Sequence, residues 1–333
     1  MSGRRRLLIL TRRRSGAAFR QRIEPYIAPL AERGIEADVA ELAGTAWGRA
    51  RQWAAGARYA GVLIQKKTLT AWDAAFLRGA GAVIYDFDDA IMYKAGAAER
   101  GPDRGRMRRF RRTVRRADRV IAGNAVLADH AAGAGAASVE VIPTGLDVSR
   151  YTAPVPREDP EVFRLVWIGS RSTLKQLAMR RSALEAIGRS RADIVLRVIA
   201  DAPLSVEGLA VENVPWSLEA EAALLGSSDA GIAPMPDTPF TRGKCGFKVL
   251  QYMAAGLAVI TSPVGVNAEY VQAGLTGLWA RTDEEWVGAV GTLAGNGDLR
   301  RRLGAEGRRR VAAFDFAALA DRFCDTVQSA LDR

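Results

Sequence analysis

Residues 237–267 read DTPFTRGKCGFKVLQYMAAGLAVITSPVGVN, and this stretch holds the pattern that decides the fold. A glycine-rich turn leads into an amphipathic run at 247–255, which is followed by a short apolar run at 258–261. The first run has helical spacing, and the second has the length of a buried strand. A turn, a helix and a strand in close succession are typical of α/β proteins. The turn also carries Lys244 and Lys248, two cations four residues apart.

The same alternation extends over the whole chain. Short apolar runs, which we expect to be strands, lie at 7–10, 61–64, 82–85, 119–122, 139–143, 165–168, 195–199, 229–233 and 258–261. Helical patterns lie between them, at 19–33, 70–79, 107–117, 176–188 and 247–255. Near-continuous apolar strands separated by helices predict parallel sheets that are covered on both faces. Because ligands of such sheets bind beyond the carboxyl ends of the strands, functional residues are expected in the loops that follow strands.

The length of 333 residues predicts two domains. The segment TAPVPREDPEV at 152–162 contains three prolines and is the best candidate for a linker. We therefore expect two doubly wound, Rossmann-like α/β domains, one over 1–153 and one over 154–315. Two cysteines far apart in the sequence give no disulfide framework, and the N-terminal segment has too few apolar residues for a secretory signal. No run reaches the roughly 18 apolar residues that a membrane span needs, so a cytoplasmic location is expected.

Charge is distributed unevenly along the chain. Residues 1–150 contain 27 Lys and Arg against 15 Asp and Glu, a net charge of +12, whereas residues 151–333 contain 21 against 22. This asymmetry predicts an anionic partner for the first half, such as a nucleic acid, a lipid surface or a phosphorylated substrate. The alternative is a general arginine bias with a solvated surface.

The most basic segment is RGRMRRFRRTVRRADR at 104–119. Met107, Phe110 and Val114 fall on one helix face, and arginines surround the rest. This pattern favours a core-packed helix with a solvated or membrane-facing basic side. A nucleic-acid helix is disfavoured, because no recognised nucleic-acid module accompanies the segment.

The turn FTRGKCG at 240–246 has the flexibility to place backbone N–H groups around an anion. A helix that begins near Phe247 would direct its positive end at the same place. Lys244 and Lys248 would add point charges for a diphosphate, and Gly246 would allow a close approach of the backbone. The alternative is an ordinary loop before a helix, with exposed lysines.

Seven segments of the chain, taken in order, resemble the GT-B glycosyltransferases, and specifically the retaining glycosyltransferase family 4, the glycosyl transferases group 1. In the first half these are SGAAFRQRIEPYIAPLAERGI, VIYDFDDAI, ADRVIAGNAVLADHA and VEVIPTGLDVSRY. In the second half they are VWIGSRSTLKQL, SSDAGIAPMPDTPF and GKCGFKVLQYMAAGLAVITSPVGVNAEYV. The resemblance implies an acceptor-binding first domain and a nucleotide-sugar-binding second domain that face a central cleft. It also implies that residues 316–333 form a helix that crosses back to the first domain.

The implied activity is transfer of a sugar from a nucleoside-diphosphate sugar, of the UDP or GDP type, to a hydroxyl acceptor with retention of configuration. Glycan, polysaccharide or glycolipid synthesis is the expected context. The nucleotide sugar would be a substrate, and neither a cofactor nor a metal ion is implied. One histidine and two distant cysteines also make a zinc site an unattractive expectation.

The resemblance places the donor site on named positions. The family has two glutamates eight positions apart, and the matching residues here are Gly243 and Gln251. Gln251 can still bind a ribose hydroxyl without a charge, whereas Gly243 offers no side chain. The chain follows a GKCGFKxLQYMAxG version that resembles one branch of the family. The residues expected to bind the donor are Gly16, Gly169, Gly243, Lys244, Cys245, Gly246, Phe247, Lys248 and Gln251.

Arg171 and Lys175 follow Gly169, where the family has a basic pair that holds the diphosphate. Cations at this position would stabilise the negative charge that develops on the leaving oxygen, so both are expected to be catalytic. In the first domain the resemblance places Arg20 near the acceptor, and Arg22 is as well explained as a solvated arginine.

The segment YDFDDA carries Asp86, Asp88 and Asp89 directly after an expected strand. Three uses remain open: orientation or deprotonation of the acceptor hydroxyl, a structural helix cap, and a metal site. We favour the first, with Asp86 binding the acceptor and with Asp88 and Asp89 as catalytic residues.

Other functions also fit parts of the sequence. Asp86 and Asp88 would suit a metal-dependent phosphatase or transferase, and the two missing glutamates would suit a non-catalytic nucleotide-sugar-binding protein. An epimerase on the same fold is a weaker alternative. Under the favoured hypothesis the partners are a nucleotide-sugar donor and a lipid-linked or anionic hydroxyl acceptor. Peripheral contact of the basic half with an anionic membrane is also expected, and nucleic acid is not.

Overall fold

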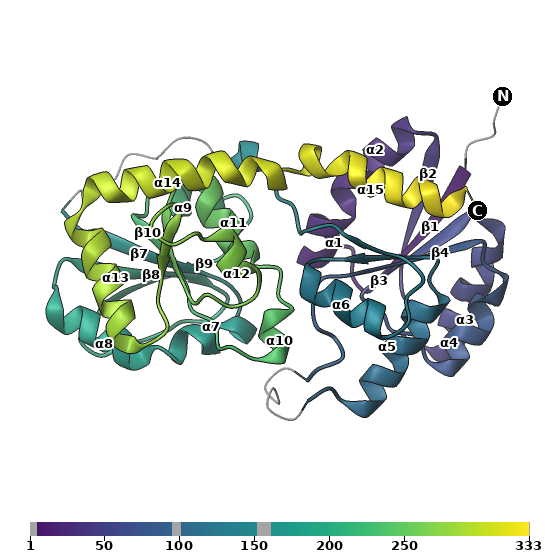
Figure 1. The fold of residues 1–333 in the computed structure, drawn as a ribbon, viewed down its shortest axis with the longest axis horizontal. Coiled ribbons are helices and arrows are strands. Elements are labelled where there is room, and N and C mark those ends of the chain that lie inside the picture. The colour runs from purple at the N-terminus through teal and green to yellow at the C-terminus, as the bar shows by residue number, and fades with distance from the viewer. Residues whose placement is uncertain (1–4, 95–100, 152–160, 333) are drawn as a thin grey trace. The chain divides into compact units, whose positions relative to one another are not determined.

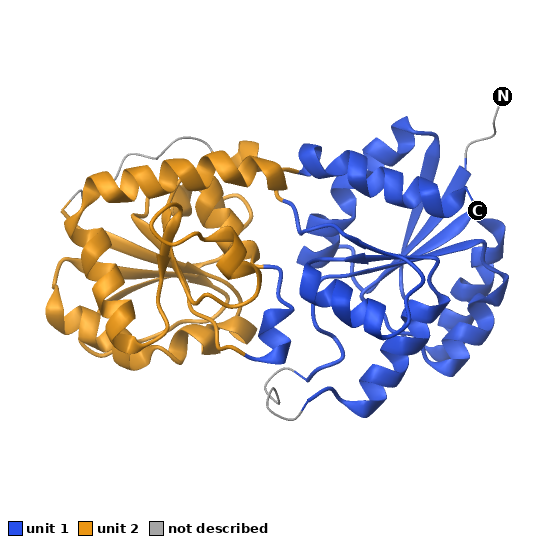
Figure 2. Ribbon diagram, viewed as in Figure 1, with its two compact units in different colours: residues 1–145, 238–245, 316–333 blue, residues 146–237, 246–315 orange. Residues whose placement is uncertain are grey.

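A computed structural model describes residues 5–94, 101–151 and 161–332 of the chain. The chain divides into two compact units, which are coloured separately in Figure 2. Unit 1 comprises residues 1–145, 238–245 and 316–333, and unit 2 comprises residues 146–237 and 246–315. Most of the expected linker, residues 152–160, lies outside the described residues. Residues 238–245, which the sequence analysis assigned to the second domain, belong to unit 1.

Unit 1 contains a parallel sheet of six strands in the order β2-β1-β3-β4-β5-β6. The strands are β1 (Arg5–Thr11), β2 (Ile35–Glu41), β3 (Gly61–Gln65), β4 (Ala82–Phe87), β5 (Arg119–Ala122) and β6 (Val139–Val141). Alternate side chains of β1 enter opposite hydrophobic clusters, with Leu7 and Ile9 in one and Leu8 and Leu10 in the other. This period of two is the pattern of a strand that is buried on both faces.

Helices cover both faces of the first sheet (Figure 1). One face carries α1 (Ala17–Arg22), α2 (Ile27–Glu32) and α15 (Phe316–Leu331). The other carries α3 (Ala46–Ala55), α4 (Ala71–Phe76), α5 (Arg104–Arg116) and α6 (Ala125–Gly133). The C-terminal helix α15 is held by a stacked pair of rings, Phe323 on Tyr26, with centroids 4.4 Å apart. Unit 1 also contains α10 (Pro239–Arg242) and the 3-10 turns η1 (Glu24–Tyr26), η2 (Gly56–Arg58) and η3 (Leu77–Gly79).

Unit 2 repeats this architecture with the strand order β12-β11-β10-β7-β8-β9, again all parallel. The strands are β7 (Phe163–Ile168), β8 (Ile194–Ala200), β9 (Ala210–Pro215), β10 (Ala230–Ala233), β11 (Ala258–Thr261) and β12 (Gly277–Trp279). One face carries α7 (Arg171–Ala178), α8 (Arg181–Ser190) and α13 (Asp283–Gly295), and the other carries α9 (Glu221–Gly226), α11 (Phe247–Ala254) and α12 (Val266–Tyr270). Helix α14 (Gly297–Val311) contributes to both clusters, and η5 (Val148–Arg150) and η6 (Ala312–Phe314) complete the unit. The predicted class, two doubly wound α/β domains with parallel sheets, is confirmed.

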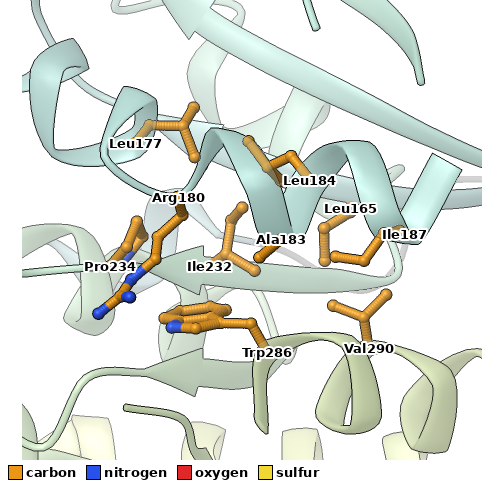
Figure 3. Close-up of a pocket in the computed structure, with 10 residues that line it drawn as sticks. All are labelled: Leu165, Leu177, Arg180, Ala183, Leu184, Ile187, Ile232, Pro234, Trp286 and Val290. Carbon is orange, nitrogen blue, oxygen red and sulfur yellow. The ribbon is translucent and has the colours of Figure 1, made fainter. Parts of the chain in front are cut away.

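A small apolar cavity lies between the helices and the sheet of unit 2 (Figure 3). Its volume is about 10 Å³, and Trp286 of α13, Ile232 of β10 and Leu184 of α8 are among the residues that line it. A space of this size is about one water molecule wide and cannot admit a nucleotide. It is therefore a packing gap in the core. Among the described residues, no helix combines the length and the apolarity that crossing a membrane requires.

Two glycines of unit 2 allow a direct test of helix packing. A Cβ atom added at Gly304 of α14 would lie 2.0 Å from the carbonyl oxygen of Gly256, whereas nothing lies within 4 Å of a Cβ at Gly288 of α13. We expect Gly304→Ala to lower the free energy of unfolding by about 1–3 kcal/mol, because backbone must move. Gly288→Ala should raise it by up to about 1 kcal/mol through helix propensity.

Urea unfolding followed by the fluorescence of the buried Trp167 and Trp286 measures both changes. Equal effects of the two substitutions would contradict the close approach of α14 to the end of α11.

Candidate functional site

A cluster of four charged side chains lies at the carboxyl edge of the unit 1 sheet. Lys66 follows β3, and its Nζ lies 2.6 Å from Asp88 Oδ1 and 2.7 Å from Asp89 Oδ2, in the loop after β4. Lys244 Nζ lies 3.6 Å from the other oxygen of Asp89. Burial lowers the pKa of Lys66, but the two carboxylates outweigh burial and raise it overall. The loops after β3 and β4 therefore bring Lys66, Asp88 and Asp89 together, and the segment 238–245 adds Lys244.

The backbone of Lys66 is strained. Its φ is 55°, and among the described residues it is the only non-glycine residue with positive φ. Its N–H donates to the carbonyl oxygen of Asp86 at 2.8 Å, which fixes this conformation beside the next strand. Such strain costs about 1–3 kcal/mol and is found most often at functional sites. Nothing in the sequence indicated Lys66, because a lysine after a strand has no motif of its own.

Asp86 forms a buried ion pair with Arg22. Arg22 Nη2 lies 2.5 Å from Asp86 Oδ1, Nε donates to both carboxylate oxygens at 3.1 Å, and Nη1 donates to the carbonyl oxygen of Ile142 at 3.0 Å. Asp86 is fully buried and Arg22 is 3% exposed. Asp86 is still inside β4, so its side chain enters the face covered by α1. The predicted acceptor role of Asp86 does not fit this burial, and Arg22 is not a solvated arginine.

The remaining first-unit candidates lie at α1. Gly16 is its N-cap, and a Cβ there would lie 3.2 Å from the carbonyl oxygen of Arg13, so the turn after β1 is tight. Arg20 lies in the last turn of α1 and is partly exposed. Gly16 therefore lies in the turn after β1, and Arg20 lies on the helix that follows this turn.

Residues 238–245 pack onto the same edge of unit 1. Asn124, the N-cap of α6, accepts from the Leu127 N–H at 2.9 Å and donates to the carbonyl oxygens of Gly243 and Lys244, each at 3.2 Å. Cys245 Sγ donates to the carbonyl oxygen of Asp88 at 3.1 Å. Asn124 thus caps a helix and holds this segment at once, a role that no motif in the sequence indicated.

Steric contact explains why a glycine stands at 243. A Cβ atom there would lie 2.7 Å from the Cβ of Ala90 and 2.9 Å from Leu127 Cδ2. A glutamate, which the family pattern has at this position, therefore cannot be accommodated without moving the segment. Gly123 is equally constrained, since its Cβ would lie 2.4 Å from the sulfur of Cys245.

The site shifts the pKa values of its acids in opposite directions. Burial raises the pKa of Asp89, but Lys66 and Lys244 outweigh burial and lower it overall, so Asp89 is ionised at neutral pH. Burial raises the pKa of the Cys245 thiol to about 12, and the negative charge of Asp88 contributes in the same direction. Cys245 is therefore a neutral packing residue.

The start of α11 belongs to unit 2. Gly246 is its N-cap with φ of 59°, and no side chain caps this helix end in the described part of the chain. A Cβ at Gly246 would lie 2.9 Å from both Asn267 Oδ1 and Val266 Cγ2, so only glycine fits. Phe247 opens the helix and is partly exposed. Lys248 Nζ lies over the buried ring of Trp167, 4.2 Å from its centroid, a cation–π contact.

Gln251 reaches a buried carboxylate through a tyrosine. Its Nε2 donates to the hydroxyl of Tyr151 at 3.3 Å, and that hydroxyl donates to Glu221 Oε1 at 2.7 Å. Trp216 Nε1 donates to the second oxygen of Glu221 at 2.8 Å. Burial and the neighbouring carboxylate raise the pKa of Tyr151 well above its ordinary range. No motif in the sequence indicated these hydrogen bonds, because Tyr151 and Glu221 are far from Gln251 in sequence.

The basic pair after β7 lies on α7. Arg171 opens the helix, and its N–H donates to Asp201 Oδ1. Lys175 lies one turn further on, and both side chains are exposed. Gly169 is required sterically, because a Cβ there would lie 2.4 Å from Trp167 Cη2.

The described residues contain no group of three or more His, Cys, Asp or Glu side chains that could hold a metal ion. Asp86 and Asp88, which the metal hypothesis paired, have different partners. Asp86 binds Arg22, and Asp88 binds Lys66.

Residues 157–296 match a family model described as glycosyl transferases group 1. The matched residues lie in the second half of the chain, and most of them belong to unit 2. A curated relative, the D-inositol 3-phosphate glycosyltransferase of Nocardia farcinica, is 27% identical over 247 residues, which are 66% of this chain and 54% of the relative. The chain thus spans about half the length of that relative.

Two solved structures share the GT-B fold over nearly the whole chain. The Anabaena protein HepE in complex with UDP and glucose superposes with a TM-score of 0.75 at 15% identity, covering 98% of this chain and 100% of the other. The sucrose-phosphate synthase of Thermosynechococcus elongatus gives a TM-score of 0.76 at 14% identity, covering 98% and 99%.

The packing at Gly243 can be tested by a pair of substitutions. Gly243→Ala should destabilise unit 1 by about 1–3 kcal/mol, because the new methyl group meets Ala90. Adding Ala90→Gly should restore part of the loss, and Ala90→Gly alone serves as the control. Chemical denaturation of all three variants measures the coupling. Strictly additive effects would contradict the contact between the two positions.

The two thiols give a second prediction. Cys245 and Cys324 are buried, with pKa values raised by burial to about 12 and about 11. At pH 8 a thiol reagent should label Cys245 about 1,000-fold more slowly than an unfolded cysteine, because so little thiolate is present. The folded chain keeps the Cys245 proton above pH 9, where the unfolded chain releases it, so stability should fall as the pH rises beyond about 9. Rapid labelling of the native protein would contradict the burial of these thiols.

Proposed function

We propose that the protein transfers a sugar from a nucleoside-diphosphate sugar to a hydroxyl acceptor. The observation that carries this proposal is the glycine-capped start of α11, which lies inside the segment that matches the group 1 glycosyltransferase model. Its backbone N–H groups have no side-chain cap, and lysines stand on both sides of the turn at 244 and 248. The fold shared with a protein that binds UDP and glucose supports the same donor class.

The diphosphate is proposed to bind at the turn 243–248. The positive end of α11 and the closely approachable backbone at Gly246 favour an anion there. Lys244 and Lys248 would supply charge, with Cys245 and Phe247 shaping the turn. Arg171 and Lys175, after Gly169, are proposed to stabilise the charge that develops on the leaving oxygen.

Gln251 is proposed to bind a donor hydroxyl through its neutral amide. Its Nε2 is already directed at Tyr151, and Tyr151 is fixed by Glu221, so the amide has a defined orientation. Because Gly243 leaves no room for a carboxylate, the donor sugar must be recognised by other groups. The lack of a carboxylate at position 243 also favours a second candidate function, that of a non-catalytic nucleotide-sugar-binding protein.

The acceptor is proposed to bind at the carboxyl edge of the unit 1 sheet, near Arg20. Asp88 and Asp89 would orient the acceptor hydroxyl, and an ionised Asp89 can accept its hydrogen bond. Lys66 would hold both carboxylates in place.

We further propose retention of configuration without a metal ion, in the synthesis of a glycan, polysaccharide or glycolipid. The acceptor would be lipid-linked or anionic, and the protein would act in the cytoplasm, peripherally at the inner face of a membrane. NMR of the product anomer tests retention, and activity in excess chelator tests metal independence.

The decisive experiment is a thermal-shift panel of nucleoside diphosphates and their sugars, followed by assay of donor hydrolysis. A ligand that binds the native state raises the melting temperature, and slow release of free sugar separates an enzyme from a binding protein. If no nucleoside diphosphate or nucleotide sugar raises the melting temperature, the proposed donor class is wrong.

Single substitutions in the turn should weaken binding of the diphosphate. Lys244→Ala and Lys248→Ala should each raise its Kd by about 10-fold or more, since each removes a charged hydrogen bond of about 1.5–3 kcal/mol. Arg181→Ala, an exposed cation on α8, is the matched control and should leave the Kd unchanged. Calorimetric titration with UDP and with GDP measures the change. Parent-like binding by both lysine variants would show that the phosphates lie elsewhere.

A further inference from the structure

Four cations gather beside the loop that follows β3 in unit 1. They are Arg12, Arg49, Lys67 and Arg109. Lys67 directly follows Lys66 in that loop, and Arg12 directly follows β1, the neighbouring strand. The last residues of the two strands lie side by side, because Thr11 Oγ1 donates to Gln65 Oε1 at 2.7 Å. Since the strands are parallel, Arg12 and Lys67 both leave the sheet at its carboxyl edge.

Helix α5 brings Arg109 to the same loop. Thr113 Oγ1 accepts from the Leu69 N–H at 2.8 Å and donates to the carbonyl oxygen of Arg109, also at 2.8 Å. Arg112 donates to the carbonyl oxygen of Leu69 at 3.2 Å. Arg109 precedes Arg112 and Thr113 by three and four residues, so all three share one side of the helix. Arg109 therefore lies on the side of α5 that contacts the loop.

Helix α3 contributes Arg49. Its Nε lies 3.3 Å from Asp73 Oδ1 of α4, and its Nη1 donates to two carbonyl oxygens of the loop before α3, at 3.3 and 3.1 Å. Asp73 is fully buried and also accepts from Trp53 Nε1 and from the Thr70 N–H, each at 3.0 Å. The carboxylate of Asp73 is thus already used by groups of the fold.

The positive charge of this group is poorly compensated. Burial lowers the pKa of Lys67, Asp73 opposes that change, and the like charges of Arg49, Arg12 and Arg109 lower the pKa further. Four cations and one carboxylate leave a net charge of +3. Within the described ranges, Arg12, Lys67 and Arg109 form no ion pair. Lys67 is half-buried, whereas Arg12 and Arg109 are exposed, so an anion from solvent can reach the group.

Two exposed tryptophans lie beside these cations. Trp47 of α3 is 68% exposed and Trp72 of α4 is 44% exposed, and their rings meet edge to face with centroids 5.3 Å apart. Each is the second residue of its helix, and both helices follow strands of the sheet. Trp72 directly precedes Asp73, which binds Arg49 two residues after Trp47. Large aromatic side chains that cluster in solvent mark a binding surface.

We propose that these residues bind a phosphorylated sugar. The group is called the Lys67 site and consists of Arg12, Trp47, Arg49, Lys67, Trp72 and Arg109. A phosphate ester carries a charge of about −1.5 to −2 and accepts paired hydrogen bonds from arginine, so it matches the excess of cations. The apolar C–H face of a sugar ring can pack on the exposed aromatic faces. An anion without an apolar ring would leave the two tryptophans without a use.

The Lys67 site deepens the proposed function and rests on it, because it identifies the acceptor as a phosphorylated sugar. Lys66 and Lys67 are consecutive, so their Cα atoms are about 3.8 Å apart. The side chain of Lys66 holds Asp88 and Asp89, which are proposed to orient the acceptor hydroxyl. The phosphate at Lys67 would thus hold the acceptor while its hydroxyl faces the two carboxylates.

The test is a titration of the full chain followed by phosphorus NMR, with inorganic phosphate and with glucose 6-phosphate as probes. Both should bind, and the sugar phosphate should bind more tightly. Lys67→Gln and Arg109→Gln should each weaken binding of both probes about 10-fold or more, since each removes a charged hydrogen bond. The matched control is Arg78→Gln, an exposed arginine of η3 just before β4, at the opposite edge of the same sheet. It should bind both probes as the parent does.

The tryptophans have a different signature. Trp47→Ser/Trp72→Ser should weaken binding of glucose 6-phosphate and leave binding of inorganic phosphate unchanged, because only the sugar ring uses the aromatic faces. A glucose phosphate esterified to a short prenyl chain distinguishes the two sources of such an acceptor. Tighter binding of this ester indicates a lipid-linked sugar phosphate, and equal or weaker binding indicates a free one.

Phosphate also suits the turn 243–248, so each titration is repeated with saturating UDP. Probes at the Lys67 site should bind in addition to UDP, whereas probes at the turn would be displaced by it. Thermal unfolding shows whether each variant is folded. Lys67→Gln relieves repulsion among the cations, so its melting temperature should equal or exceed that of the parent while its binding is lost.

Three outcomes would overturn the proposal. They are parent-like binding of glucose 6-phosphate by Lys67→Gln and Arg109→Gln, complete displacement of both probes by UDP, and parent-like binding of glucose 6-phosphate by the tryptophan variant. If the sugar phosphate binds as expected but no nucleoside diphosphate raises the melting temperature, the Lys67 site stands and the proposed donor is wrong. If UDP binds and the sugar phosphate does not, the donor proposal stands and the Lys67 site is wrong.

Discussion

The site depends on how residues 238–245 are anchored to the first sheet. Asn124 uses one side-chain amide to cap α6 and to hold the carbonyl oxygens of Gly243 and Lys244. Cys245 packs against Gly123 and donates to the backbone of Asp88. No side chain fits at Gly243, because Ala90 fills the space. These contacts fix the backbone immediately before the start of α11, and they place Lys244 beside Asp89.

Two lysines and two aspartates in and beside residues 238–245 form ion pairs, and the distances in these pairs show which lysine is held less tightly. Lys66 neutralises Asp88 and Asp89, while Lys244 shares Asp89 at the longer distance of 3.6 Å. A diphosphate that approached Lys244 would therefore compete with only one, distant carboxylate oxygen. The deeper pair of Arg22 and Asp86 is satisfied internally and serves to hold α1 against β4. Breaking one member of such a buried pair leaves an uncompensated charge, so its role is structural.

The sequence predicted the central strands well and the edge strands poorly. β2, β9 and β12 were missed, and each lies at the end of its sheet. Edge strands are half solvated, so they lack the continuous apolar run by which β1 or β11 could be found. The pattern at 176–188 also hid a break between α7 and α8, which no proline or glycine marks. Of the candidate site, Asp88 and Asp89 follow β4, whereas Asp86 is still inside this strand and is buried against Arg22. Asn124, Lys66 and Tyr151 could not be found, since their partners come from distant segments.

The central claim is that a diphosphate binds at the turn 243–248, and amide hydrogen exchange tests it most directly. Exchange of the peptide covering 243–250 should be measured with and without saturating nucleoside diphosphate. The account predicts slower exchange in that peptide, since the backbone N–H groups at the start of α11 would bind phosphate oxygens. Unchanged exchange there, with protection appearing in another part of the chain, would contradict it.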